Sequence, residues 1–164
     1  MVINTSTYLK PISTLLKVKL DNTKSKIPTS ETTVKIFNLL KKSNSPLGPQ
    51  NQIEKIQIQQ WIEYAQVYGV HVDSSYNAKI VLKELNNILA LKTYLVSHRL
   101  TIADILFFYM LLRVMETLSN LDKEKYLNVC RWFDNIQNDT LLRDNNKIID
   151  FRSNFLATWV PAKH

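Results

Sequence analysis

Apolar residues recur at spacings of three and four through most of the chain after residue 50, which is the period of helices with one buried face. The pattern predicts helices over residues 51–68, 77–91, 101–118, 122–137 and 141–159. The 101–118 helix is apolar almost all round, as expected at the centre of a bundle. In the 51–68 helix an apolar stripe comprises Ile53, Ile56, Trp61, Tyr64, Ala65 and Tyr68. Ile58 and Ile62 fall off this stripe, so we expect this helix to be buried on two sides.

The first 49 residues carry a weaker pattern. Residues 8–20 fit either a helix or a short strand, and Pro11 suits the first turn of a helix but not its middle. Residues 32–42 predict a helix. Two prolines and a glycine in 43–49 then predict an exposed linker, which divides the chain into parts 1–49 and 50–164. The first part is too short to bury a core of its own, so we expect it to lean on the second.

Composition excludes several classes of site. The 164 residues hold only two glycines, too few for a Gly-rich phosphate loop, and one cysteine, Cys130, which excludes an internal disulfide. The three histidines show no metal-ligand spacing, so we expect neither a metal nor a cofactor. No apolar run is long enough to span a bilayer, and the N-terminus does not read as a secretory signal. A reduced intracellular compartment is the default expectation.

The net charge of +7 is concentrated in one segment. Residues 1–49 hold eight lysines and two acidic residues, a balance of +6, whereas residues 50–164 hold thirteen basic and twelve acidic residues. Such a basic segment is able to touch RNA or anionic lipid, but dispersed lysines on a solvated surface are the commoner explanation. Few aromatic residues accompany these lysines. Any contact with tRNA is therefore expected to be weak and salt-sensitive.

The most specific local signal is the stretch 100–105, Leu-Thr-Ile-Ala-Asp-Ile. Thr101 and Asp104 have the spacing of a capping box, in which each side chain satisfies the backbone N–H of the other. Leu100 and Ile105 flank the box as a hydrophobic staple. We expect this motif to start the central helix, and its loss to cost about 1–2 kcal/mol. It is a folding device and not a catalytic group.

This capping box, at the head of a buried helix, resembles that of the glutathione S-transferase C-terminal domain family. Residues 59–64 and 124–133, supported by 81–86, resemble the non-catalytic scaffold subunits of the multi-aminoacyl-tRNA-synthetase complex. The resemblance covers residues 50–164 well, whereas residues 1–49 match only in layout. It implies a mainly α fold, glutathione S-transferase-like, with a truncated thioredoxin-like N-terminal lobe before an all-helical C-terminal domain. It also implies a cytosolic scaffold that binds methionyl-tRNA synthetase and glutamyl-prolyl-tRNA synthetase, with a nuclear role in DNA-damage signalling.

Two surfaces are candidates for these partners. Arg131 lies off the inward stripe of the 122–137 helix, either as an exposed arginine paired with Asp134 or as an interface anchor. The resemblance assigns it to the contact with glutamyl-prolyl-tRNA synthetase. The second surface, expected for methionyl-tRNA synthetase, lies around the linker and comprises Val34, Phe37, Gln57, Ile58 and Ile62. Packing of Ile58 and Ile62 on the N-terminal part is the alternative. Pairing of similar folds also permits a homodimer when the partner is absent.

The rival hypothesis is a glutathione transferase or a glutathione-binding protein. Tyr8 or Ser13 would supply the hydroxyl, Ile27-Pro28 the proline-bounded strand and Glu31-Thr32 the pair that grips the γ-glutamyl group. A complete thioredoxin-like lobe, however, needs roughly 75–80 residues. Arg131 beside Cys130 would lower the pKa of that thiol, but a lone cysteine is more often a small packing residue. We therefore expect a non-catalytic protein.

Overall fold

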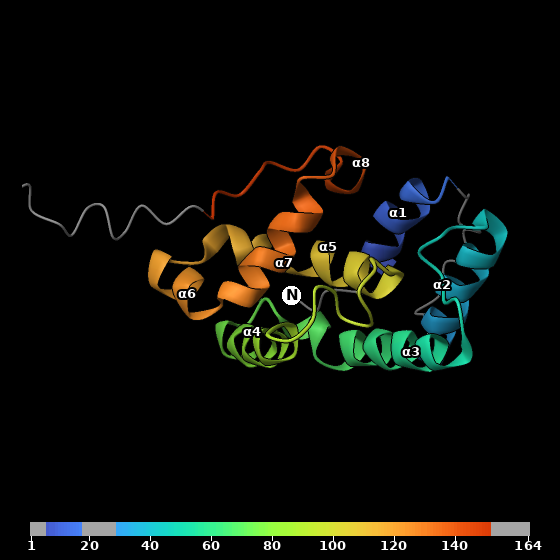
Figure 1. The fold of residues 1–164 in the computed structure, drawn as a ribbon, viewed down its shortest axis with the longest axis horizontal. Coiled ribbons are helices and arrows are strands. Elements are labelled where there is room, and N and C mark those ends of the chain that lie inside the picture. The colour runs from blue at the N-terminus through green and yellow to red at the C-terminus, as the bar shows by residue number, and fades with distance from the viewer. Residues whose placement is uncertain (1–5, 18–28, 152–164) are drawn as a thin grey trace, which may run out of the picture.

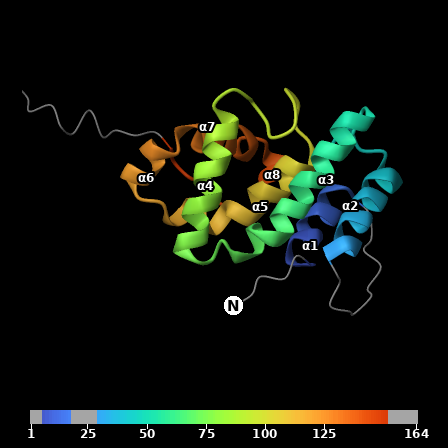
Figure 2. The same cartoon turned by 90° about the horizontal axis from the view of Figure 1, so that it is seen from below.

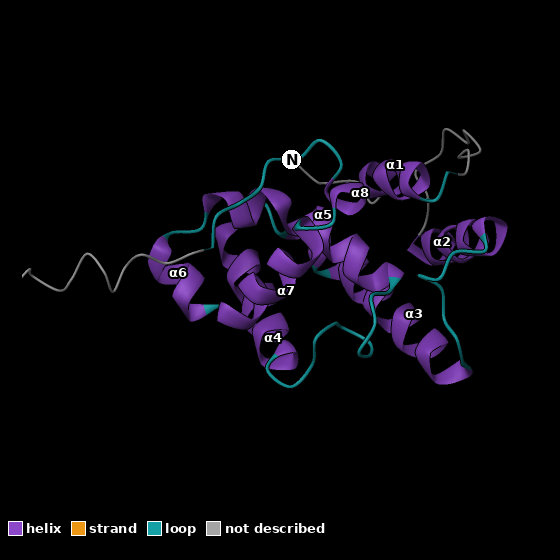
Figure 3. Cartoon of the chain, turned by 45° about the horizontal axis from the view of Figure 1, so that its top comes forward, coloured by secondary structure: helices purple, strands orange, loops and turns teal. Residues whose placement is uncertain are grey.

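The computed structural model describes residues 6–17 and 29–151, and within these ranges it is helical, with no strand (Figures 1 and 3). The elements are α1 (Ser6–Leu15), α2 (Thr29–Ser43), α3 (Gln52–Val67), a 3-10 turn η1 (Gly69–His71), α4 (Ser75–Leu89), α5 (Ile102–Thr117), α6 (Asn120–Lys125), α7 (Leu127–Gln137) and α8 (Thr140–Arg143). The mainly α fold is confirmed, as are the helices predicted at 32–42, 51–68, 77–91 and 101–118.

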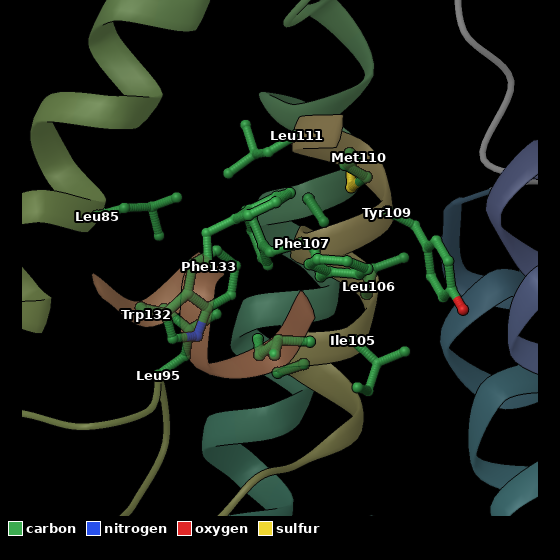
Figure 4. Packing of buried hydrophobic residues seen from close by; sticks show 14 of the residues in the cluster. Leu85, Leu95, Ile105, Leu106, Phe107, Tyr109, Met110, Leu111, Trp132 and Phe133 are labelled. Atoms are coloured by element: carbon green, nitrogen blue, oxygen red, sulfur yellow. The ribbon is translucent and has the colours of Figure 1, made fainter. Parts of the chain in front are cut away.

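Helix α5 forms the centre of the fold, as its apolar sequence predicts. It contacts α1, α3 and α7, and every residue from its start to Leu111 is buried. Aromatic rings pack around it: Phe108 lies 4.6 Å from the Phe133 ring of α7, and Phe107 lies 5.4 Å from the Trp61 ring of α3. Figure 4 shows this cluster, with Trp132 and Phe133 beside the α5 side chains. The core is therefore built around one helix that is buried on every side as far as Leu111.

The N-terminal helices share this core instead of forming one of their own. Ile12 of α1 and Ile36 of α2 are fully buried in the cluster that contains the α5 side chains. Pro11 lies inside α1, so the expectation that it occupies a first turn is wrong; burial of Ile12 offsets the lost backbone hydrogen bond. Residues 18–20 of the segment that fits either a helix or a strand, and the proline-bounded strand at Ile27-Pro28, lie outside the described residues. The thioredoxin-like lobe and the domain division at residue 49 therefore stay predictions.

The linker between α2 and α3 is held in place, which corrects the expectation of an exposed connection. Leu47 packs against the core, and its carbonyl accepts a hydrogen bond of 3.0 Å from the backbone N–H of Ile102. The Arg99 guanidinium donates to the carbonyls of Pro46 and Gly48, each at 2.7 Å, and forms an ion pair with Glu54. Arg99 thus joins the linker to the first turn of α3.

The predicted helix at 122–137 is broken at Tyr126, where α6 ends and α7 begins. The Asn86 side chain of α4 causes α7 to start there: its Oδ1 accepts from the backbone N–H of Asn128 at 2.9 Å and of Val129 at 3.4 Å. The Asn128 amide donates in return to the Asn86 carbonyl at 3.1 Å. A residue distant in sequence therefore satisfies the first amides of α7. The inward stripe of Tyr126, Val129, Phe133 and Ile136 is confirmed as buried.

The helix predicted at 141–159 is wrong over the described part beyond α8. Asp144 adopts a positive φ of 53°, which ends the helical path. The buried Gln137 side chain then takes the place of helical hydrogen bonds. Its Nε2 donates to the Ile149 carbonyl at 2.8 Å, and its Oε1 accepts from the Ile149 N–H at 2.9 Å. Residues 152–159 lie outside the described residues.

The predicted capping box is present, and its carboxylate has a wider role than a cap. Asp104 is fully buried and accepts hydrogen bonds at 2.8–2.9 Å from the hydroxyl and backbone N–H of Thr101. Its other oxygen accepts from the Leu95 backbone N–H at 2.8 Å and from the Trp132 indole N–H at 3.0 Å. Burial raises the pKa of Asp104, while these four donors act to lower it. One carboxylate thus connects the 90–101 loop, the start of α5, and α7.

Replacing this carboxylate should be costly. In Asp104→Ala, the buried N–H groups of Leu95 and Trp132 lose their acceptor. Each unsatisfied donor costs about 1–3 kcal/mol of stability, and the loss of the helix cap adds to this. We therefore expect the free energy of unfolding, measured by urea denaturation, to fall by about 3–5 kcal/mol. Asp139→Ala removes an exposed cap that accepts from Leu141 and Leu142 and should cost only about 1 kcal/mol. Equal losses in the two variants would contradict the role of Asp104 as a buried junction.

The Arg99–Glu54 ion pair, which helps to hold the linker in place, should weaken in acid. The hydrogen bond from Arg99 and the backbone N–H of Gln50 hold the pKa of Glu54 below its ordinary 4.5. A carboxyl group with a lowered pKa stabilises the fold above its unfolded pKa, and that contribution is lost as pH falls through the folded pKa. Wild type should therefore exceed Glu54→Gln in stability near neutral pH, and the difference should shrink below pH 4.5. Urea denaturation across pH measures this; a constant difference would count against the ion pair.

Candidate partner interface

The predicted interface residue Arg131 has a structural contact that its sequence position does not reveal. Its guanidinium Nη2 donates to the carbonyls of Leu89 and Lys92, at 2.6 and 3.0 Å. These carbonyls lie at and just after the end of α4, where a cation interacts favourably with the helix dipole. The expected intrahelical pairing with Asp134 is not formed; Asp134 accepts from Gln137 instead. Arg131 remains exposed, so the guanidinium that caps α4 is also accessible to a partner.

The second predicted surface is only partly exposed. Val34 of α2 is 57% exposed, while Phe37 and Gln57 are half-buried. Ile58 and Ile62 are fully buried, so the expectation that they lie on a partner-binding patch is wrong. They face the core because α3 packs against both α2 and α5 through the stripe that also contains Ala65. The alternative given by the sequence, packing of this pair on the N-terminal part, agrees with the contact of α3 with α2, although α3 also packs against α5.

The stripe that the sequence assigns to the core is instead largely exposed. Ile53 is 70% exposed and Ile56 is 50% exposed, and Val67 and Tyr68 continue the same outward line at the other end of α3. Only Ala65 of the predicted stripe is fully buried, with Trp61 and Tyr64 half-buried. The expectation that this helix is buried on two sides is therefore wrong: it is apolar on two sides, but the described part of the chain covers only one of them. The stripe that the sequence pattern assigned to the core, with Ile53 and Ile56, faces outward, and the side with Ile58 and Ile62 faces the core.

A groove lies where α3 and α4 diverge, with the 90–101 loop across its open end (Figure 2). Its volume is about 340 Å³, and it is lined by Gln57, Gln60, Trp61, Tyr64, Ile88, Lys92 and Leu95. The rings of Trp61 and Tyr64 lie 5.6 Å apart, edge to face. The Tyr64 hydroxyl donates to the Glu84 carboxylate across the two helices, and burial raises the pKa of that hydroxyl. The groove thus combines aromatic walls with amide groups and a single charged residue.

The residues considered for enzyme chemistry are engaged elsewhere or lie outside the described part. The Ser13 hydroxyl donates to the Lys10 carbonyl at 2.8 Å, and Thr32 is buried. The side chains of Tyr8 and Glu31, like the residues Ile27-Pro28, are outside the described residues. Burial raises the pKa of the Cys130 thiol to about 11, so the expectation that Arg131 lowers it is wrong. Among the described side chains of this set, none forms an activated nucleophile.

Over the described ranges, no group of three or more His, Cys, Asp or Glu side chains is arranged to hold a metal ion. Nor is any described helix both long and apolar enough to cross a membrane.

Arg131 should contribute modestly to stability through its contact with α4. Arg131→Ala leaves the Leu89 and Lys92 carbonyls to water, and we expect a loss of about 1–2 kcal/mol in the free energy of unfolding without loss of the fold. Urea denaturation followed by circular dichroism measures it. Arg113→Ala, at an exposed α5 arginine, is the control and should change stability by less than about 0.5 kcal/mol. A neutral Arg131→Ala would mean that the cap contributes nothing.

Comparisons with known proteins support the resemblance seen in the sequence. A family profile described as nuclear-export cofactor Arc1p matches residues 54–140. The chain is 43% identical to human eukaryotic translation elongation factor 1 epsilon-1 over 106 residues. The aligned region covers 64% of this chain and 60% of the human protein. It is 41% identical over 103 residues to the mouse protein of the same name, 63% of this chain and 59% of the relative. The match thus spans about three fifths of the length of these curated relatives.

Proposed function

Because this chain belongs to the nuclear-export cofactor Arc1p family, we propose that it is a non-catalytic scaffold of the multi-aminoacyl-tRNA-synthetase complex that supports protein synthesis. The observation that carries the proposal is the second apolar stripe of α3, which stays exposed although its opposite side is fully buried. An apolar stripe of this kind is typical of a surface that another protein covers. The name of the similar proteins, eukaryotic translation elongation factor 1 epsilon-1, agrees with a role in protein synthesis.

Two surfaces serve two partners in this proposal. The surface between α2 and α3 docks methionyl-tRNA synthetase, with Val34, Phe37 and Gln57 joined by the exposed Ile53 and Ile56. The α7 surface around Arg131 docks glutamyl-prolyl-tRNA synthetase. Arginine is enriched among binding hot spots because its planar guanidinium forms several hydrogen bonds at once. Support comes from the exposure of Arg131 and from its fixed position, since the carbonyls of Leu89 and Lys92 already orient it.

The location and the nucleic-acid contact follow from the same role. A synthetase scaffold acts in the cytosol, and we extend the proposal to a nuclear pool that takes part in DNA-damage signalling. Lysines near the N-terminus, among them the exposed Lys10 and Lys41, would add weak, salt-sensitive contact with tRNA held by a bound synthetase.

The alternative, glutathione binding or transfer, has less support. The Ser13 hydroxyl and Thr32 are buried, and the Cys130 thiol is held in its protonated form by burial. A buried thiol with a raised pKa is a poor nucleophile, because the thiolate is the reactive species. These observations favour a protein that acts through its surfaces.

The test is capture of purified synthetase domains by the purified full chain. We expect capture of the N-terminal domains of methionyl-tRNA synthetase and glutamyl-prolyl-tRNA synthetase. Ile56→Asp should weaken the first at least about tenfold and leave the second unchanged, since it places a charge on the exposed stripe of α3. Arg131→Ala should do the reverse.

Leu141→Asp is the matched control for a charge placed on an exposed leucine, because Leu141 is 78% exposed and lies on α8, which Figure 1 shows away from α3 and α4. It should change neither affinity. Failure to capture either synthetase domain would reject the proposed function. An equal effect of Ile56→Asp on both partners would reject the division into two surfaces.

A further inference from the structure

A cavity lies where the start of α4, the end of α5 and the junction of α6 with α7 meet. Its volume is about 310 Å³, at the lower end of the range of about 300–1,000 Å³ that is typical of small-molecule sites. It shares no lining residue with the groove between α3 and α4. Figures 1 and 2 show α4 and α6 at the same end of the molecule, away from α1 and α2. The cavity is therefore separate from both surfaces proposed for the synthetases.

The lining of this cavity combines a buried apolar part with an exposed charged part. Val72, Ala78 and Leu82 line it and are at most 6% exposed. Lys79 of α4 and Arg113 of α5 also line it, and both are exposed. Among the described residues, nothing forms a hydrogen bond or an ion pair with the side chain of either cation. Two helices thus bring two uncompensated positive charges to one apolar hollow.

A buried tyrosine in the lining has a hydroxyl without a partner. Tyr126 is only 2% exposed, and its hydroxyl forms no hydrogen bond within the described part of the chain. The hydroxyls of Tyr64 and Tyr109 are less deeply buried, and both donate to an acceptor. A buried tyrosine hydroxyl normally finds a partner. The cavity is therefore expected to supply one for Tyr126.

The start of α4 adds a positive potential to the same place. Ser75, the first residue of α4, lines the cavity, and the N-cap residue Ser74 makes no side-chain hydrogen bond to the first amides. The positive end of the α4 dipole thus lies beside Lys79 and Arg113. Cations, a hydroxyl donor and a helix start together favour a carboxylate.

Acidic residues in the lining balance these cations. Asp73 lines the cavity, is exposed, and has no hydrogen bond or ion pair with any described group. Asp122 lines it too, but its carboxylate already accepts from the Ser119 hydroxyl at 2.7 Å. The lining thus holds two cations and two acidic residues, and Asp73 is the acidic residue still able to bind a positive group. A ligand with charges of both signs matches this pattern better than an anion or an amine.

We infer that this cavity binds a free α-amino acid with an apolar side chain. Arg113, Lys79 and the Tyr126 hydroxyl donate to its carboxylate, and Asp73 accepts from its ammonium group. The side chain of the ligand packs on the buried apolar part of the lining. Arg113 is suited to this role because its guanidinium binds a carboxylate through two parallel hydrogen bonds. The inference goes beyond the proposed function and does not depend on it.

Titration of the purified full chain with L-leucine, followed by the NMR shifts of the backbone amides, is the test. We expect saturable shifts at residues that line the cavity, among them Ser75, Ala78 and Thr117. Isocaproate lacks the ammonium group of leucine, isoamylamine lacks its carboxylate, and glycine lacks its side chain. Each should bind at least about tenfold more weakly, because each loses one of the three contacts.

Substitutions in the lining separate this site from general charge effects. Arg113→Gln should weaken the binding of L-leucine at least about tenfold. Tyr126→Phe removes only the unpartnered hydroxyl, so it should weaken binding at least about threefold and leave the thermal midpoint unchanged. Lys79→Gln should also weaken binding at least about threefold. Lys83→Gln is its matched control, because Lys83 is exposed one turn further along α4 and does not line the cavity.

Three results would overturn the inference. The first is an absence of saturable shifts with L-leucine, L-isoleucine and L-phenylalanine. The second is isocaproate that binds as tightly as L-leucine, and the third is an equal effect of Lys79→Gln and Lys83→Gln. None of them bears on the capture of synthetase domains, which tests the proposed function separately.

Discussion

A buried carboxylate without a cationic partner is the constraint on which this fold depends. Asp104 accepts four hydrogen bonds, and none of their donors carries a full charge. The desolvation of such a group is tolerated only when its donors are all in place, since a half-satisfied buried charge is strongly unfavourable. The loop at Leu95, the cap at Thr101 and the indole of Trp132 must therefore adopt their positions together. The arrangement of α4, α5 and α7 follows from this requirement.

The surface features depend on the same junction. Arg131 reaches the end of α4 only because α7 is anchored by Trp132, and the 90–101 loop presents its side chains only because its backbone is bound at Leu95. Asn86 and Asn128 add a second tie between α4 and α7. A fold tied together in this way presents a surface that is ordered before any partner arrives, which lowers the entropic cost of binding.

Local signals in the sequence were sufficient for part of this structure. The capping box lies within four residues, and the apolar periodicity of α5 sets its central place, so both were predictable. The roles of the two α3 stripes were not, because the choice between Ile58 and Ile53 depends on where α2 and α5 pack. The break at Tyr126 and the position of Arg131 were not predictable either. Both depend on contacts of α7 with residues in or just after α4, about forty residues away in the sequence. Contacts of that separation leave no periodic signal in a single sequence.

The burial of Cys130 has a practical consequence for studying the molecule. The only thiol of the chain is shielded from solvent, with a pKa raised to about 11, so very little thiolate exists at neutral pH. Alkylating fluorophores and spin labels should consequently pass over the native cysteine under mild conditions. A cysteine engineered at any exposed position would then carry the label alone, without prior removal of Cys130.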